Sequence, residues 1–227
     1  GVHTNNHSFN VAVGRSLEFG ASTVQTFNQN GGTFSNQGAF VFSSNDILNF
    51  NGGNFTGNAV ELSGSILNIG PGSTGTGTFN AFGGAYSGDL AAAQTVNFHA
   101  TDASTSSTTA TTDFTNNGTI QLNSDFDGRD VTLFRDGTII NSATGTISFG
   151  GSSFSASTDR QLQANLFVND GTVNINQNAL FNRNGGVHTN NHSINVAVGR
   201  SLEFGASTVQ TFNQNGGTFS NQGAFVF

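Results

Sequence analysis

One segment of 42 residues occurs twice, and this duplication constrains the fold more than any other feature of the sequence. Residues 1–42 recur at 186–227 with a single difference, Phe9 in the first copy and Ile194 in the second. The chain therefore divides into one long repeat, residues 1–185, and the beginning of the next. Near-identical tandem units indicate an architecture of stacked repeats, and we interpret the chain as a window from a longer array.

The composition excludes several classes of protein. Charged residues are 8% of the 227, against about 25% in an ordinary domain, whereas 23 Phe exceed what a disordered chain carries. The net charge of −7 disfavours nucleic acid as a partner, because phosphates require a basic patch. There is no Cys for disulfides or thiolate metal sites, and no apolar run is long enough to span a membrane as a helix. This composition favours an extracellular or cell-surface location.

Short runs of alternating apolar residues recur along the chain. Examples are Val60/Leu62, Val96/Phe98, Ile120/Leu122, Ile147/Phe149 and Val173/Ile175. Each run ends at Gly, Asn or Asp, as β-strands bounded by turns do. No apolar stripe of helical spacing persists for three turns, so the sequence predicts an all-β fold.

A recurring motif predicts the turns: an apolar residue, two variable residues, Asn or Asp, then Gly. Its glycines are Gly31, Gly52, Gly118, Gly137, Gly171, Gly185 and Gly216. Asn-Gly and Asp-Gly turn the chain at low cost because both residues tolerate a positive φ. The same dipeptides form two-residue hairpins, so an antiparallel meander is an alternative.

The spacing of this motif favours a parallel β-helix (β-solenoid) over hairpins. Gly31 and Gly52 are 21 residues apart, and Gly118 and Gly137 are 19 apart, which suits one turn of a solenoid, called a coil below. Stacked coils place like residues in register, so Asn and Phe form ladders. One repeat then contains about eight coils, on the order of 40 Å of axis. We expect the core to include Phe27, Phe34, Phe114, Ile120, Leu133, Phe167 and Val173.

Two segments interrupt this pattern. Residues 70–88 contain the single Pro and the single Tyr, and residues 100–112 contain no large apolar side chain. We expect both segments to loop off the solenoid wall, where a binding function would reside.

The strand–turn units have a familiar form. Phe114–Leu122 (FTNNGTIQL) and Phe167–Ile175 (FVNDGTVNI) resemble units of bacterial β-solenoid surface proteins, namely autotransporter passengers and filamentous-haemagglutinin-like adhesins. The resemblance covers most of the chain through a degenerate motif. It implies a right-handed parallel β-helix, export to the cell surface, and roles in adhesion, aggregation or extracellular fibres.

The candidate ligand sites are sparse. Asp125, Asp127 and Asp130 resemble the first half of a calcium loop, but the distal Glu is missing, and a surface turn neutralised by Arg129 is the favoured interpretation. His3 and His7 would lie on one face of a strand about 13 Å apart, too far to share a metal. We expect no cofactor.

The sequence favours a structural role without enzymatic activity. The 13 carboxylates are thinly spread and form no convincing catalytic pair, which disfavours a polysaccharide lyase or hydrolase. We expect a filament or stalk segment that self-associates into fibres or bundles. The alternative is an adhesin that binds glycans or surfaces through residues 70–88 and 100–112.

Overall fold

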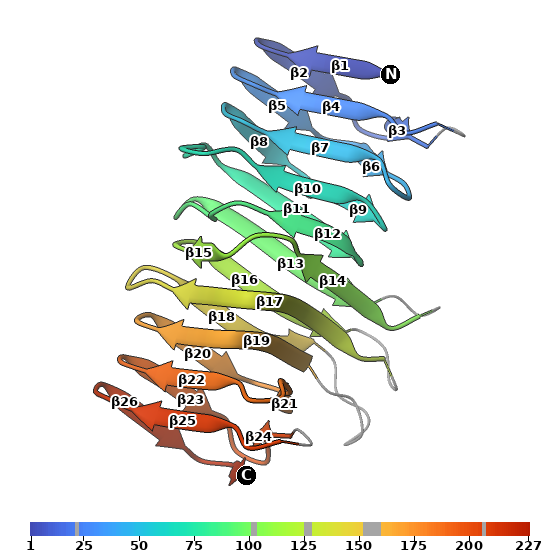
Figure 1. Cartoon of the computed structure of the whole chain (residues 1–227). Coiled ribbons are helices and arrows are strands. Elements are labelled where there is room, and N and C mark those ends of the chain that lie inside the picture. The colour runs from blue at the N-terminus through green and yellow to red at the C-terminus, as the bar shows by residue number, and fades with distance from the viewer. Residues whose placement is uncertain (21–22, 101–103, 125–128, 152–159, 206–207) are drawn as a thin grey trace.

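The computed structural model is an all-β parallel solenoid of about nine turns. It describes residues 1–20, 23–100, 104–124, 129–151, 160–205 and 208–227. Strands stack as rungs along one axis, with the two termini at opposite ends (Figure 1). Every strand pairing within these ranges is parallel, so the predicted solenoid is confirmed and the antiparallel meander is wrong. The same ranges contain no helix that could cross a membrane.

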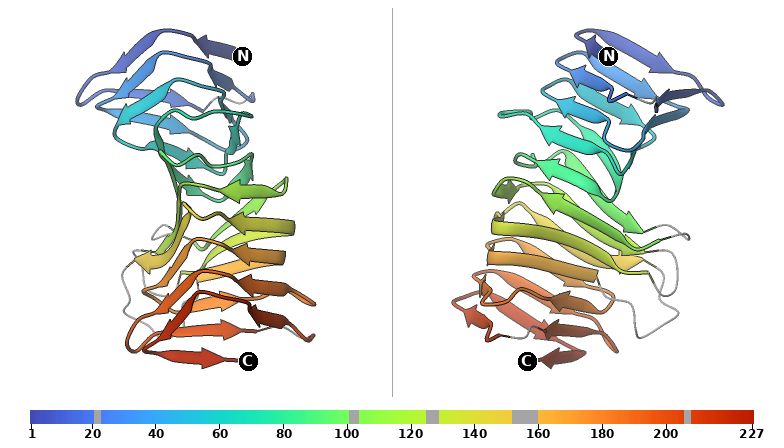
Figure 2. Two further views of the ribbon diagram at one scale, coloured as in Figure 1. Left: turned by 90° about the vertical axis from the view of Figure 1, so that its left-hand side faces the viewer. Right: turned by 45° about the vertical axis from the view of Figure 1, so that its right-hand side comes forward.

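The strands form three sheets that run along the axis (Figures 1 and 2). The 14-stranded sheet contains β1 (Val2–Asn5), β4 (Thr26–Gln29), β7 (Ile47–Phe50), β10 (Ile66–Ile69), β12 (Gly84–Ser87), β14 (Ser106–Ala110), β15 (Phe114–Asn116), β17 (Val131–Asn141), β19 (Arg160–Asn169), β21 (Ala179–Phe181), β22 (Val187–Asn190), β24 (Ser201–Phe204), β25 (Thr211–Gln214) and β27 (Ala224–Val226). The 10-stranded sheet contains β3 (Ser16–Phe19), β6 (Ala39–Phe42), β9 (Val60–Ser63), β11 (Gly77–Phe82), β13 (Gln94–Ala100), β16 (Thr119–Ser124), β18 (Thr146–Gly151), β20 (Thr172–Ile175), β23 (Ser193–Val196) and β26 (Thr218–Asn221). The third sheet contains β2 (Ser8–Val11), β5 (Thr33–Asn36) and β8 (Asn54–Gly57).

Alternation along each strand divides its side chains between the core and the solvent. Most strands between the end coils show buried residues at every second position, as a period-two pattern requires. The expected core residues Phe27, Phe34, Phe114, Ile120, Leu133, Phe167 and Val173 are each at most 4% exposed. Burying one such side chain contributes about 1.5–3 kcal/mol, so the stacked core is the main source of stability.

Six of the seven motif glycines lie in bends or turns between strands, and two physical reasons account for glycine there. In three of the four Asn-Gly-Gly turns the second glycine has the positive φ, 65° at Gly32, where a side chain would collide with the His7 carbonyl; in the turn at 184–186 the first glycine, Gly185, has it. Gly118 has no positive φ, but a Cβ would lie 2.4 Å from the carbonyl oxygens of Ala91 and Gln94. Glycine is therefore required for two reasons: the positive φ at some positions, and the close approach of the neighbouring coil's backbone at others.

The turn predicted at Gly137 is wrong, because Gly137 lies inside strand β17. The pairing of β17 with β19 shifts register between Arg135 and Thr138, so two residues on β17 oppose one on β19. This irregularity is a β-bulge, which absorbs the Asp-Gly pair without ending the strand.

The two segments expected as loops also require correction. Strands β11 and β12 occupy much of residues 70–88, with Phe79 and Tyr86 buried in the core. Strand β14 occupies 106–110, where Thr108 and Ala110 face inward. Ala110 pairs with Tyr86 on the adjacent coil, and this large ring lets small side chains complete the core beside it. Residues 101–103 lie outside the described ranges.

The two copies of the 42-residue segment occupy different faces of the solenoid. The strand path that begins at β1 ends at β24 and β27, and the path that begins at β3 ends at β23 and β26. The first strand of copy one is therefore stacked with the third strand of copy two. Strands β17 and β19, with 11 and 10 residues, are long enough to span two faces in between. One repeat advances the chain by whole coils plus one face.

Candidate functional surface

Amide side chains form a ladder on the outside of the 14-stranded sheet. The Nδ2 of Asn49 donates to the Oδ1 of Asn28 at 2.7 Å, and Asn68 donates to Asn49 at 2.8 Å. The Ser87 hydroxyl extends this row, donating to Asn68 at 2.7 Å. Because in-register parallel coils repeat the same position, each amide meets another amide one coil away. This ladder links four consecutive coils at half-exposed positions.

A second ladder is buried at the corner that follows β15, β17, β19 and β22. Asn116, Asn141, Asn169 and Asn190 are joined by Nδ2–Oδ1 hydrogen bonds of 2.7–2.8 Å and are all fully buried. The first three also donate to the backbone carbonyl of the first residue of a 10-stranded-sheet strand one coil further along, as Asn169 does to Ser193 at 2.9 Å. A buried amide without partners would cost about 1–3 kcal/mol, so this ladder holds consecutive corners in one register.

A third row of polar side chains follows the 10-stranded sheet. Asn80 donates to the Glu61 carboxylate at 2.8 Å, and Asn97 and Asn123 continue the row. Partial burial raises the pKa of Glu61 above its ordinary value, although the Asn80 hydrogen bond acts in the opposite direction. This carboxylate has the role of an acceptor at the end of an amide row.

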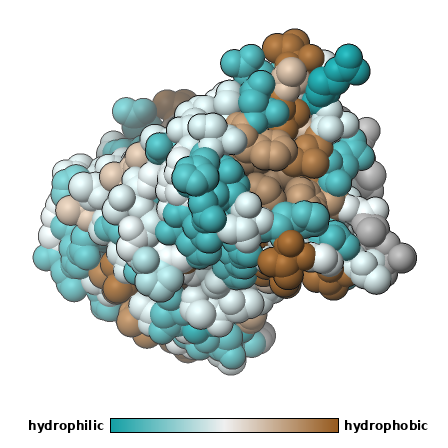
Figure 3. Space-filling model, turned by 90° about the horizontal axis from the view of Figure 1, so that it is seen from above, coloured by the Kyte–Doolittle hydropathy of each residue, from teal (hydrophilic) through white to brown (hydrophobic). Residues whose placement is uncertain are grey.

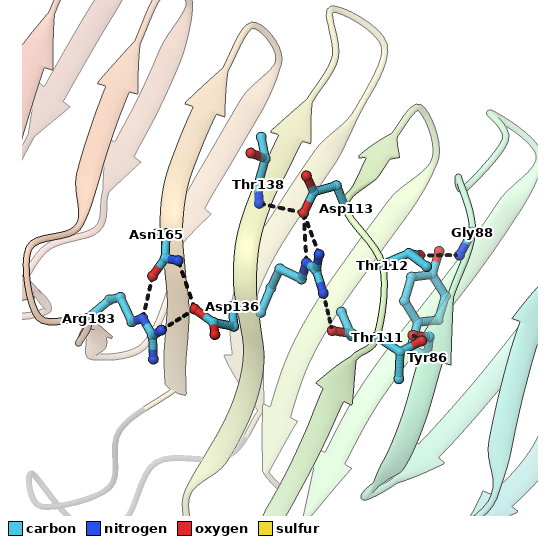
Figure 4. A network of polar contacts seen from close by, with 11 residues as sticks. Tyr86, Gly88, Thr111, Thr112, Asp113, Asp136, Thr138, Asn165 and Arg183 are labelled. Atoms are coloured by element: carbon cyan, nitrogen blue, oxygen red, sulfur yellow. Dashed lines mark hydrogen bonds and ion pairs between the residues drawn. The ribbon is translucent and has the colours of Figure 1, made fainter.

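An ion pair occupies the outer face of the 14-stranded sheet, between the segment before β15 and strand β17 (Figure 4). The Asp113 carboxylate accepts from Arg135 Nη2 at 2.7 Å and from the Thr138 backbone N–H at 2.8 Å. These contacts, the Thr138 N–H first, lower the pKa of Asp113. A Cβ at Gly137 would lie 2.1 Å from the Asp113 carboxylate, so glycine in the bulge makes room for the pair.

A neighbouring network joins β17, β19 and the segment after β21 (Figure 4). Arg183 is paired with Asp136, and Asn165 lies between them, accepting from Arg183 at 2.6 Å and donating to Asp136 at 2.8 Å. The Arg183 guanidinium also lies over the Phe134 ring, 5.1 Å from its centroid. Asp113 and Asp136 are therefore each compensated by an Arg.

The surface beside these pairs is shallow. A depression of about 240 Å³ is lined by Asp89, Asp113, Phe114, Thr115, Thr138 and Ile140. One of its two carboxylates, Asp113, has a lowered pKa, which is the reverse of what a general acid at neutral pH requires. The nearby Tyr86 is buried, and burial raises the pKa of its hydroxyl, which stays neutral. This geometry suits surface contact better than acid–base chemistry.

The calcium candidate is only partly within the described residues. Asp125 and Asp127 lie outside them, and Asp130 directly precedes β17, where its backbone carbonyl accepts from Ser106 N–H at 2.9 Å. Within the described ranges no group of three His, Asp or Glu side chains is placed to hold a metal.

The paired histidines behave differently in the two copies. His3 is exposed, whereas His188 is fully buried beside the rings of Phe181 and Phe204. His188 Nε2 lies 2.8 Å from Gln210 Oε1 and Nδ1 has no hydrogen-bond partner. Desolvation lowers the pKa of His188, so the neutral ring is favoured. The sequence predicts solvent-facing histidines in both copies, because the neighbours of His3 and His188 in sequence are identical. For His188 this prediction is wrong, because the preceding coil covers the ring.

The ion pairs were missed for a related reason. Asp113 and Arg135 are 22 residues apart, and Asp136 and Arg183 are 47 apart, one and two coils respectively. The spacing of the coils was the available signal, but coil length varies along the chain.

No protein-family model, no curated protein and no solved structure matches the chain.

Proposed function

We propose that this chain is a structural repeat segment of a long, secreted or surface-attached β-solenoid filament or stalk. In this role it acts in cell-surface architecture, aggregation or attachment, and it has no enzymatic activity. The observation that carries the proposal is that both copies of the duplicated segment belong to one continuous stack, each copy in register with the coils beside it. A chain built this way extends by adding repeats.

The mechanical basis is cooperation between neighbouring coils. Each coil forms hydrogen bonds with the backbone N–H and C=O groups of the next coil. The buried Asn ladder and the Phe stacks resist sliding of one coil over another. The low charge and the paired ions on the outer faces favour side-by-side association of rods, because few charges have to be desolvated. The polar, cysteine-free composition and the resemblance to bacterial surface proteins support an extracellular location.

Cryo-electron microscopy of a chain with three or more repeats tests the proposal. We expect rods with an axial spacing of about 4.8 Å and a longer period near 40 Å. Successive repeats are expected to be rotated about the axis by one face, because copy two is shifted by one face relative to copy one. Compact particles without this spacing would contradict the filament.

Lateral association is tested separately with Arg183→Gln, which removes the ion pair to Asp136 on the outer face. If rods associate through neutral outer faces, the uncompensated carboxylate reduces bundling while single rods remain. Glu18→Gln, at an exposed position on β3, is the control for a charge change elsewhere. Equal bundling of all three chains would show that this face takes no part.

A further inference from the structure

The first coil of the chain presents an open, apolar end. Strands β1, β2 and β3 are each the last strand of their sheet, so their outer backbone edges face away from the stack. Between them lies a pocket of about 580 Å³ whose lining includes His3, Asn5, Phe9, Leu17, Phe19 and Phe27. Viewed onto this end in Figure 3, brown hydrophobic side chains are surrounded by hydrophilic ones.

The same sequence is covered at the other end of the molecule. In copy two, β22 pairs with β19, β23 with β20 and β24 with β21. The exposed fraction of the side chain at the one differing position falls from 40% for Phe9 to 1% for Ile194. His188 and Leu202, the counterparts of His3 and Leu17, are fully buried.

The covering segment, residues 160–185, recognises copy two by specific contacts. The Phe181 ring lies 5.1 Å from His188 and 5.4 Å from Phe204. Asn169 donates to Asn190 at 2.7 Å, and Asn191 donates to the Asp170 carboxylate at 2.7 Å.

Further polar contacts hold the other two faces in register. The Asn195 amide donates to Asn174 at 3.1 Å, and the Ser201 N–H donates to Asn178 at 3.2 Å. These groups of copy two have identical counterparts in copy one, namely Asn10 and Ser16.

We propose that the first coil is a docking surface for residues 160–185 of a second copy of this repeat. The proposal rests on the proposed function, since it names the partner that a filament places at this end. Asn169 of the second copy then donates to Asn5, Asp170 accepts from Asn6, and Phe181 lies between His3 and Phe19. The partner's edge strands complete the three open edges in parallel.

The single sequence difference between the copies bears directly on this fit. Ile194 pairs in register with Val173. Phe9 would therefore lie against the Val173 position of the second copy, and it already stacks on Phe34 with ring centroids 4.9 Å apart. Residues 160–185 of the second copy must therefore fit against the larger Phe9 ring. A variant of the full chain tests this requirement.

Ile194→Phe makes residues 186–227 identical to residues 1–42 while keeping the native cover. Hydrogen exchange of β22–β24 is measured in this full-length variant and in the wild type. Unchanged protection is expected, since the proposal requires that residues 160–185 fit the Phe9 surface. A loss of protection of about tenfold or more, the effect of roughly one mispacked core side chain, would overturn it.

The second experiment adds the partner directly. Residues 160–185 are placed before Gly1 of the full chain, so that Gly185 precedes Gly1 as it precedes Gly186 in the native sequence. Exchange of the β1–β3 amides is expected to slow by about tenfold or more, approaching that of β22–β24, because the edge becomes buried. Exchange at the unextended rate would overturn the proposal.

The matched control carries the same extension with its copies of Phe167 and Phe181 replaced by Asp. It is expected to leave exchange of β1–β3 at the unextended rate, which separates specific docking from the mere presence of added chain. Neither experiment measures filament formation. Failure of docking is therefore distinguishable from failure of the filament proposal, in which longer arrays form no rods.

Discussion

Residues 1–42 and 186–227 differ at one position, yet their burial is almost complementary. The first coil is exposed in copy one and covered in copy two: β1 has one buried residue, whereas β22 has two and no exposed residue. The second coil shows the reverse, since Phe42 is fully buried whereas its counterpart Phe227 is 71% exposed. Identical local sequence has therefore produced two environments.

This comparison shows that a coil acquires its environment from its neighbours. In copy one the second coil has a coil on both sides, and in copy two the first coil does. Stability is then close to a sum of coil and interface contributions, as in other repeat proteins. Equivalent substitutions in the two copies should have unequal effects wherever cover differs, and equal effects where it does not.

The largest difference is expected for Asp in the Phe stack. Phe27 is buried among Phe19, Phe34 and Phe40, whereas Phe212, its counterpart, is only partly buried in the last coil. Phe27→Asp should destabilise by about 4 kcal/mol or more, through lost packing and a buried carboxylate, and Phe212→Asp by about half as much. Chemical denaturation of both variants measures the difference. Equal losses would contradict the dependence on cover.

Phe167→Asp provides the corresponding test in the middle of the stack. Phe167 is 1% exposed and packs on Phe181, with ring centroids 5.5 Å apart. The loss of stability should be similar to that of Phe27→Asp, because each residue lies in a coil with a neighbouring coil on both sides. An unchanged thermal unfolding curve would remove this residue from the core.

A smaller difference in stability is expected for Gln29 and Gln214, which are paired in register with Asn5 and Asn190 of the preceding coil. Gln29 accepts from Asn5 at 2.9 Å and donates to the Gly31 carbonyl at 2.7 Å. Gln214 makes the same two bonds, to Asn190 and Gly216, but is exposed. Gln29→Ala should cost about 1–3 kcal/mol because Gln29 is itself fully buried, so that water cannot replace its hydrogen bonds. Gln214→Ala should cost about 0.5 kcal/mol because this side chain is exposed to water. Calorimetric unfolding resolves the two values, and a larger loss at Gln214 would be contrary to expectation.

The buried histidine should make stability depend on pH. Burial lowers the folded-state pKa of His188 below its ordinary value of 6.5, so the unfolded chain binds the proton more readily. The free energy of unfolding therefore carries no penalty from His188 above about pH 6.5, and it decreases as the pH falls from there through the folded-state pKa. His188→Gln should reduce this loss, whereas His3→Gln, at the exposed counterpart, should leave it unchanged. Melting curves between pH 7.5 and pH 5 provide the measurement.

The smallest effect is expected where both copies face solvent. Glu18 and Glu203 are exposed at corresponding positions of β3 and β24. Replacement of either by Gln should change the free energy of unfolding by no more than about 0.5 kcal/mol. A clear difference between these two variants would mean that something besides cover distinguishes the copies.

Much of the fold followed from local pattern. Alternation such as Val173/Ile175 indicates a strand in any context, and the turn glycines mark where strands end. Gly137 shows the limit of such reasoning, since an Asp-Gly pair is compatible with a turn and with a bulge. The segments 70–88 and 100–112 show a second limit of local reasoning. They were expected to be loops, but Ala110 is buried in the core because Tyr86 on the adjacent coil fills the space beside it.

The sequence by itself determined the strands, most of the turns, the apolar core and the repeat period, because each depends on residues close together in the chain. Only the tertiary structure decided which sheet each strand joins, which copy buries its histidine, and which Asp meets which Arg. The physical reason is that coil length varies, from a register offset of 17 residues between β11 and β13 to 29 between β17 and β19. The residues that meet across coils depend on the sum of these lengths, which places identical segments on different faces.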